Sequence, residues 1–159
     1  MKLFITGIST DVGKTIASAI ITESLEADYW KPIQAGDLDN SDSHKVKGLG
    51  TSEKGKVFPN AYALNTPASP HFAAQRDGIT IDLKQINEPQ TDNHLVVEGA
   101  GGVLVPLNDT DCVIDLIQKD YKVIVVSRHY LGSINHTLLT CEALKNRNIT
   151  DRKSTRLNS

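Results

Sequence analysis

The chain has 159 residues, which is enough for one domain with a sizeable hydrophobic core. Hydrophobic residues make up 39% and charged residues 23%, which excludes a membrane protein and a disordered chain. A net charge of −2 gives no basic field for nucleic acid, and the N-terminal apolar run is too short for a signal peptide. Cys112 and Cys141 match no zinc or redox motif, so we expect core or near-core thiols and a cytoplasmic location.

Residues 7–15 read Gly-Ile-Ser-Thr-Asp-Val-Gly-Lys-Thr, between a short apolar run and a helical pattern. This arrangement favours a phosphate-binding loop, because glycines let backbone N–H groups surround an anion and a helix N-terminus adds positive potential. Lys14 would then reach the terminal phosphates, and the Thr15 hydroxyl would bind Mg²⁺. Five residues separate Gly7 from Gly13 where the common pattern has four. The alternative is a glycine turn before a helix that begins with Lys-Thr.

The first half of the chain predicts alternating strands and helices. Lys2–Thr6 should be a buried strand, and residues 14–27 a helix with an inward stripe of Ile16, Ala17, Ile20, Ile21, Ser24 and Leu25. Tyr29–Lys31 is a second strand, stopped by Pro32, and residues 32–36 should form a loop at its carboxyl end. Lys31 would face a ligand there, or else be a solvated surface lysine.

The middle of the chain predicts loops and short helices. Asn40 or Ser41 should cap a helix, residues 48–60 should be a surface excursion, and residues 65–70 a rigid loop. Ser69 would cap a short helix over residues 71–76, with His71 satisfying the loop.

Leu95-Val96-Val97-Glu98 is an apolar run that ends in a carboxylate and is followed by four small residues, Gly99 to Gly102. A buried strand with an acid at its carboxyl tip is typical of the Mg²⁺ site in phosphate-loop proteins, and the small residues would admit a ligand.

The last part predicts a helix over residues 111–119, a buried strand over residues 121–126 and a helix from Leu131-Gly132-Ser133 to about Arg147. We expect His136 to pack or hydrogen-bond. The sequence therefore predicts an α/β, phosphate-loop NTPase-like domain over residues 1–150, with a mostly parallel sheet and helices on both faces. Residues 151–159 should be a disordered or foreign tail.

Six motifs in the same order resemble the dethiobiotin synthase family, over most of residues 1–148. They are residues 7–15, Lys31-Pro32-Ile33-Gln34, Asn40-Ser41-Asp42, Ser69-Pro70-His71, residues 97–102, and residues 131–136. The long phosphate loop is that family's form. The family usually has Ser or Thr where this chain has Ala35, and its base-reading strands follow residue 150, so we expect a chain truncated at its C-terminus.

The resemblance implies roles for individual residues. Mg²⁺ would be held by Thr15, Asp42 and Glu98, and the catalytic groups would be Lys14, Lys31 and Thr10. ATP would contact Asp11, Val12, Gly13, Lys14, Thr15, Glu98, Gly99 and Gly101. The diamine substrate would contact Thr10, Lys31, Gln34, Gly102, Gly132 and Asn135. The last two would serve the second subunit's site, which implies a homodimer acting on small molecules without nucleic acid or membrane.

The implied reaction is an ATP- and Mg²⁺-dependent ligation in biotin biosynthesis, which converts 7,8-diaminopelargonic acid and CO₂ to dethiobiotin, ADP and phosphate. An amidase-type synthetase would normally add a glutaminase domain, for which 159 residues leave no room. A partition-type ATPase switch would have a loop richer in glycine and an early lysine, where this chain has Ile8 and Ser9. An inactive nucleotide-binding fragment is the remaining alternative.

Overall fold

The computed structural model describes residues 1–50, 55–149 and 155–156. A central sheet of six strands has the order β4-β2-β6-β1-β7-β8, and every neighbouring pair is parallel. Its strands are β1 (Lys2–Gly7), β2 (Asp28–Trp30), β4 (Val57–Phe58), β6 (Leu95–Gly102), β7 (Tyr121–Ser127) and β8 (Thr155–Arg156). A second, two-stranded parallel sheet consists of β3 (Ile33–Ala35) and β5 (Tyr62–Leu64).

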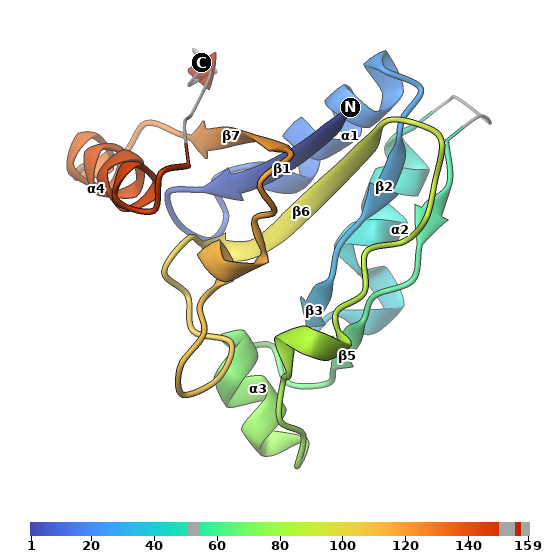
Figure 1. The fold of residues 1–159 in the computed structure, drawn as a ribbon, viewed down its shortest axis with the longest axis horizontal. Helices are drawn as coiled ribbons and strands as arrows, with labels where there is room; N and C mark the ends of the chain where they lie inside the picture. Colours follow the sequence, from blue (N-terminus) through green and yellow to red (C-terminus); the bar gives the residue numbers. More distant parts are fainter. Residues whose placement is uncertain (51–54, 150–154, 157–159) are drawn as a thin grey trace.

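Helices flank the central sheet, so the predicted fold class is confirmed. They are α1 (Lys14–Ser24), α2 (Asp42–Leu49), α3 (Pro70–Arg76) and α4 (Ser133–Asn146), with short 3₁₀ turns at Leu38–Asn40, Leu83–Gln85 and Val113–Leu116. Helices α1 and α2 lie together behind the sheet in Figure 1, and α4 lies beside β7. None of the helices in the described part of the chain combines the length and apolar character needed to cross a membrane.

The core lies around the three central strands. Strand β6 is hydrogen-bonded to β1 and β2 at its two edges, and other segments cover both faces of these strands. Phe4, Val96 and Val97 are almost completely buried as a result. This burial explains why the sequences of these strands are continuous apolar runs instead of alternating patterns. The parallel pairing places their carboxyl ends at the same edge of the sheet.

Helix α1 packs differently from the predicted stripe. Ile16 and Ile20 are 51% and 56% exposed, whereas Ala17, Ser18 and Ala19 are buried. Small side chains on the inner face allow the helix axis to come close to the sheet and to α2, and the larger isoleucines turn outward. Ser24 is also exposed, so the prediction of Ile16, Ile20 and Ser24 as part of the inward stripe was wrong.

Three other segments differ from the predicted elements. The predicted loop at residues 32–36 contains β3, which gains its hydrogen bonds from the distant β5. The segment 48–60, which was predicted as a surface excursion, contains the edge strand β4. Its residues 51–54 lie outside the described residues. The helix predicted over residues 111–119 is limited to the 3₁₀ turn Val113–Leu116. Each difference depends on pairing with a remote segment that local patterns do not reveal.

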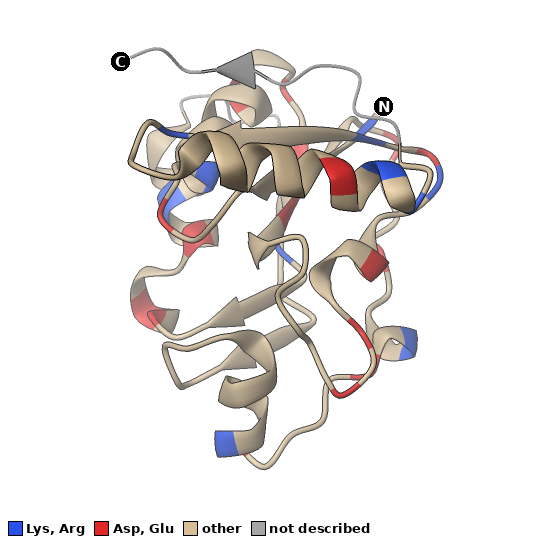
Figure 2. Ribbon diagram, turned by 90° about the vertical axis from the view of Figure 1, so that its left-hand side faces the viewer, with Lys and Arg blue, Asp and Glu red and all other residues tan. Residues whose placement is uncertain are grey.

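Charged groups of both signs are interspersed along the ribbon (Figure 2). In the tail, Thr155–Arg156 pairs in parallel with Val126–Ser127. The rest of the predicted tail, apart from residues 155–156, lies outside the described residues.

Candidate functional site

The glycine-rich segment after β1 forms a loop that closes onto α1. Gly13 has φ +97°, a left-handed conformation that suits glycine, and it is the N-cap residue of α1. Asp11, which has a side chain, also has positive φ (56°), so the loop is locally strained. The buried Lys14 donates from Nζ to the Ser9 carbonyl oxygen at 3.0 Å, which folds the lysine back along the loop.

Three adjacent parallel strands run toward the edge of the sheet that carries this loop. Strand β6 lies between β1 and β2, and the register pairs Trp30 with Val97. The next residues, Lys31 and Glu98, therefore lie at the same level on neighbouring strands. Lys31 follows the end of β2, whereas Glu98 is the fourth residue of β6, which continues to Gly102, so the acid lies within the strand and not at the predicted carboxyl tip. This is the carboxyl edge of a parallel sheet, where ligands bind in open α/β folds.

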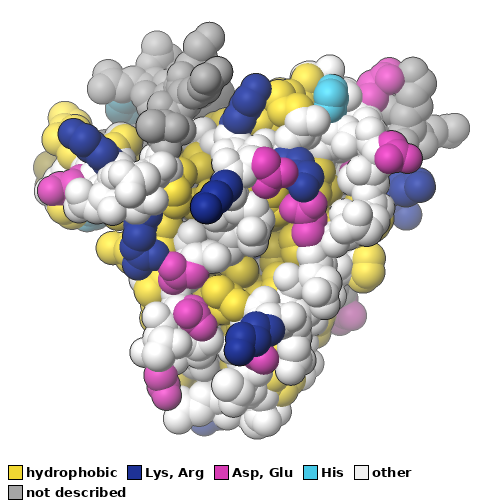
Figure 3. All heavy atoms as spheres, in the orientation of Figure 1, with side chains coloured by type: hydrophobic (Ala, Val, Ile, Leu, Met, Phe, Trp, Pro, Cys, Tyr) yellow, Lys and Arg dark blue, Asp and Glu magenta, His cyan; other side chains and the backbone are white. Residues whose placement is uncertain are grey.

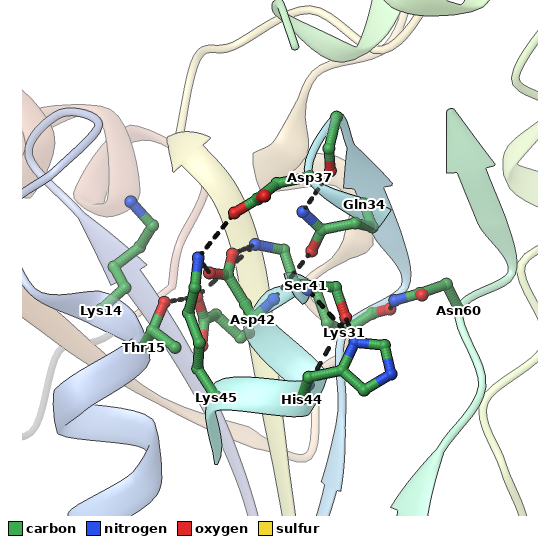
Figure 4. Close-up of polar contacts among 12 residues, drawn as sticks. Lys14, Thr15, Lys31, Gln34, Asp37, Ser41, Asp42, His44, Lys45 and Asn60 are labelled. Atoms are coloured by element: carbon green, nitrogen blue, oxygen red, sulfur yellow. Dashed lines mark hydrogen bonds and ion pairs between the residues drawn. The ribbon is translucent and has the colours of Figure 1, made fainter. Parts of the chain in front are cut away.

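Acidic and basic side chains meet at this edge. The Lys31 ammonium forms an ion pair with Asp42 and lies 3.7 Å from Oε1 of Glu98. The same Glu98 oxygen accepts a hydrogen bond from Thr15 Oγ1 at 3.0 Å. Figure 4 shows Lys31, Asp42 and Lys45 turned toward one another, with Thr15 beside them. The structure thus brings together Thr15, Lys31, Asp42 and Glu98, from four separate segments.

Burial and charge shift three pKa values here. Burial lowers the pKa of Lys14, an effect that Glu98 opposes and Lys31 reinforces. Burial alone would raise the pKa of Asp42, but the Lys31 ammonium, together with Lys45 and the Thr15 hydroxyl, outweighs it and the net pKa is lowered. Burial, reinforced by Glu98, raises the pKa of the Tyr29 hydroxyl well above its usual value. Tyr29 therefore remains a neutral hydrogen-bond donor, and Asp42 remains a carboxylate at neutral pH.

The start of α2 is fixed by side-chain hydrogen bonds. Ser41 is the N-cap and accepts from the His44 N–H, while His44 Nδ1 accepts from the Ser41 N–H at 3.2 Å. Gln34 accepts from the Asp42 N–H at 3.4 Å and donates to the Gly36 carbonyl at 2.9 Å. Of the two predicted caps, Asn40 and Ser41, Ser41 is the one that caps α2. This cap holds Asp42 in the first turn of the helix.

A cavity of about 1070 Å³ opens over these groups. Ten predicted site residues line it: Thr10, Asp11, Gly13, Lys14, Thr15, Lys31, Gln34, Asp42, Glu98 and Gly101. Gly102 instead lines a second cavity of about 390 Å³, which shares Thr10 and also touches α4 through His136.

Four predicted residues lie outside both cavities. Val12 is buried beneath the loop, and a Cβ at Gly99 would stand 3.0 Å from the Phe4 ring, so Gly99 permits close packing. Gly132 and Asn135 lie at the exposed start of α4. His136 accepts or donates a 2.7 Å hydrogen bond with the Tyr130 hydroxyl, in line with the expectation that it hydrogen-bonds.

Two residues with contacts to the charged cluster were missed. Lys45 lines the cavity and lies 3.0 Å from Asp37 and 3.7 Å from Asp42, a pairing that its i,i+3 spacing from Asp42 could have indicated. The buried Tyr29 donates to Glu98 at 2.9 Å. No local pattern marks this contact, because it depends on β6 lying next to β2.

The donor set of Thr15, Asp42 and Glu98 fits Mg²⁺. Among the described residues, no group of three or more His, Cys, Asp or Glu side chains is arranged to hold a metal ion. Mg²⁺ in nucleotide sites typically takes one or two carboxylates and completes its shell with phosphates and waters. Two carboxylates and a hydroxyl at the edge of a large cavity suit this mode better than an all-protein cage.

Comparison with known proteins agrees with this geometry. Residues 1–153 match the family model described as AAA domain. The chain is 64% identical over 146 residues to the ATP-dependent dethiobiotin synthetase BioD of Christiangramia forsetii, covering 92% of this chain and 70% of that protein. The enzyme of the same name from Cytophaga hutchinsonii is 59% identical over 150 residues, which cover 93% of this chain and 72% of that protein.

A more distant relative of that name, from Afipia carboxidovorans, is 46% identical over 150 residues, covering 93% of this chain and 71% of the relative. The phosphate loop, the neighbouring Glu98 and Lys31, and these identities support the same conclusion. The chain belongs to the dethiobiotin synthetase family of ligases.

Proposed function

We propose that the protein uses ATP and Mg²⁺ to convert 7,8-diaminopelargonic acid and CO₂ to dethiobiotin, releasing ADP and phosphate. The observation that carries the proposal is the convergence of Lys14, Lys31, Asp42 and Glu98 on one cavity that also includes the phosphate loop. The names of the relatives support the same reaction.

The phosphate loop would hold the triphosphate. Backbone N–H groups of residues 11–15 and the N-terminus of the 11-residue helix α1 offer positive potential to an anion. Lys14 would exchange its bond to the Ser9 carbonyl for the terminal phosphates. A phosphate oxygen would also favour the charged form of Lys14, which compensates for the burial of its ammonium.

Thr15, Asp42 and Glu98 would hold Mg²⁺, which when bound neutralises phosphate charge. Lys31 would then turn from these acids to the carbamate formed on one amine of the diamine. The carbamate oxygen attacks the γ-phosphorus to give a carbamic-phosphoric anhydride, and the second amine closes the cyclic urea with loss of phosphate. The protein's residues contribute positioning and charge neutralisation to each step.

The diamine would lie near Thr10, Lys31 and Gln34 and extend toward Gly102, since Thr10 lines both cavities. Its distant carboxylate would meet the start of α4, at Gly132 and Asn135, from a second subunit. Helix α4 and the segment just before it leave a group of large apolar side chains exposed, namely Leu131, Ile134, Leu138 and Leu139. Apolar atoms reach the surface around α4 in Figure 3, and this face supports a homodimer.

Product analysis tests the proposal directly. The protein is incubated with the diamine, ATP, Mg²⁺ and isotopically labelled bicarbonate, and the cyclic urea is identified by mass spectrometry. We expect labelled dethiobiotin in proportion to the phosphate released. Lys14→Ala, with an unchanged circular dichroism spectrum, should lose this activity by at least about 100-fold. ATP hydrolysis without labelled product would favour an ATPase switch, and no turnover an inactive nucleotide-binding protein.

A further inference from the structure

The two carboxylate oxygens of Glu98 have different surroundings. Oε2 accepts a hydrogen bond from the Tyr29 hydroxyl at 2.9 Å. Oε1 accepts from Thr15 Oγ1 at 3.0 Å and lies 3.7 Å from the Lys31 ammonium. One oxygen is thus turned to the protein interior and the other to the charged groups at the cavity.

Tyr29 is held firmly enough to impose this difference. It is 0% exposed and Glu98 is 1% exposed, so no water competes for the bond between them. The register pairs Tyr29 with Val96, on the strand that carries Glu98. The position of the hydroxyl is therefore set by the packing of the core, and a buried tyrosine hydroxyl that lost its acceptor would be left unsatisfied.

We propose that Tyr29 is a positioning residue that restricts Glu98 to metal binding through Oε1 alone, and that it thereby makes the site selective for Mg²⁺ over Ca²⁺. This inference rests on the proposed function, because it takes Glu98 as a metal ligand. Tyr29 itself does not line the large cavity and acts through Glu98.

The selectivity follows from how the two cations use carboxylates. Mg²⁺ is small, octahedral and bound through single oxygens at about 2.0–2.1 Å. Ca²⁺ is larger, takes about six to eight oxygens and often binds a carboxylate through both of them. Two-oxygen binding at Glu98 would require Oε2 to leave Tyr29 and turn toward the cavity. The penalty for breaking that buried bond falls on Ca²⁺ and spares Mg²⁺.

The test is the ratio of the two dissociation constants. Mg²⁺ and Ca²⁺ are titrated by calorimetry into protein bound to a non-hydrolysable ATP analogue, for the unaltered chain and Tyr29→Phe. This substitution keeps the ring and frees Oε2. We expect the ratio of the Ca²⁺ to the Mg²⁺ dissociation constant to fall about five- to tenfold. An unchanged ratio would overturn the inference.

Tyr121→Phe is the matched control. Tyr121 is also buried, and its hydroxyl also donates to a carboxylate, that of Glu88, but neither residue lines the large cavity. The two variants lose the same atom from the same kind of contact. We expect Tyr121→Phe to leave the ratio unchanged, and an equal fall in both variants would mean a general effect of core loosening and overturn the inference.

Infrared spectroscopy of the unaltered chain keeps the inference testable if Tyr29→Phe does not fold. The separation of the two carboxylate stretching bands distinguishes one-oxygen from two-oxygen metal binding, and Glu98→Gln identifies the bands of Glu98. With Mg²⁺ bound, we expect the band separation of a carboxylate that binds through one oxygen. A separation typical of two-oxygen binding would overturn the proposed role of Tyr29 and leave the proposed function intact. Mg²⁺ binding that leaves the Glu98 bands unmoved would instead remove Glu98 from the metal site and refute that part of the proposed function.

Discussion

At the scale of single residues, the site contains oppositely charged side chains that form ion pairs where they are largely shielded from solvent. Asp42 has an exposed side-chain fraction of 21% and Lys31 of 7%, yet each has the other as an ion-pair partner. Such a pair is costly to desolvate and costly to break, so removal of one partner has larger effects than at the surface. The next two predictions concern the acids of this site, Asp42 and Glu98.

The stability of the protein should depend on the ionisation of Asp42. Its folded pKa is below the ordinary value of 3.8, so its contribution to the unfolding free energy is complete above that value and is lost as pH falls through the folded pKa. Denaturant unfolding between roughly pH 5 and pH 2 should show a shallower decline for Asp42→Asn, by about 1.4 kcal/mol per unit of pKa difference removed. Parallel curves for the two proteins would contradict this reading of the ion pair.

The same acids should set the metal requirement. Asp42→Asn and Glu98→Gln should each raise the Mg²⁺ concentration for half-maximal product formation by at least about tenfold, because each removes a charged oxygen from the proposed site. Asp39→Asn is the control, since this exposed acid lies just before α2 and does not line the cavity. Unchanged Mg²⁺ titrations for both cavity variants would exclude these acids as ligands.

At the scale of elements, short segments position the charged side chains. Helix α2 has only eight residues, and its first residue is Asp42. A helix of this length has little stability of its own, so the cap at Ser41 and the brace from Gln34 matter for where Asp42 lies. The end of β2 positions Lys31, and the pairing of β6 between β1 and β2 positions Glu98.

Removal of the cap should therefore affect both stability and metal use. Ser41→Ala should lower the unfolding free energy by about 1 kcal/mol and raise the Mg²⁺ requirement, because the first turn of α2 loses its acceptor. Ser43→Ala is a close comparison, since the buried Ser43 hydroxyl has no hydrogen-bond partner among the described residues. Equal losses of stability in the two variants would show that the cap has no special part.

Elements with a strong local signal could be predicted from the sequence, and those that depend on remote partners could not. The phosphate loop and the strand that carries Glu98 each have their own residue pattern, and both form where expected, although β6 continues four residues beyond the predicted end at Glu98. Strand β3 and the contact of Tyr29 with Glu98 arise only because distant strands become neighbours. The outward turn of Ile16 depends on how closely α1 approaches the sheet, which helical periodicity does not report.

At the scale of the whole molecule, the proposed site extends from one subunit into another. The cavity contains the phosphate loop, whereas Gly132 and Asn135 lie at the exposed start of α4. If they act in a second subunit, each site depends on two chains and can be restored by combining different defects.

Mixing Lys14→Ala chains with Asn135→Ala chains should then restore activity. Random exchange makes about half of the dimers mixed, each with one intact site, so roughly a quarter of full activity is expected. Each variant alone should remain nearly inactive, and light scattering should give the mass of a dimer. Full activity in a strictly monomeric protein would rule out a shared site.

The position of β6 between β1 and β2 also has a consequence for synthesis on the ribosome. The first two strands emerge early, but neither can pair with the other, because the strand that joins them is residues 95–102. Chains arrested before residue 95 should be digested rapidly by protease, and chains arrested with β6 fully outside the exit tunnel should gain protection. Protection of the shorter chains would show an alternative early pairing. Until β6 arrives, apolar strand edges stay open to other chains, so this interval is when the nascent protein is most prone to aggregation.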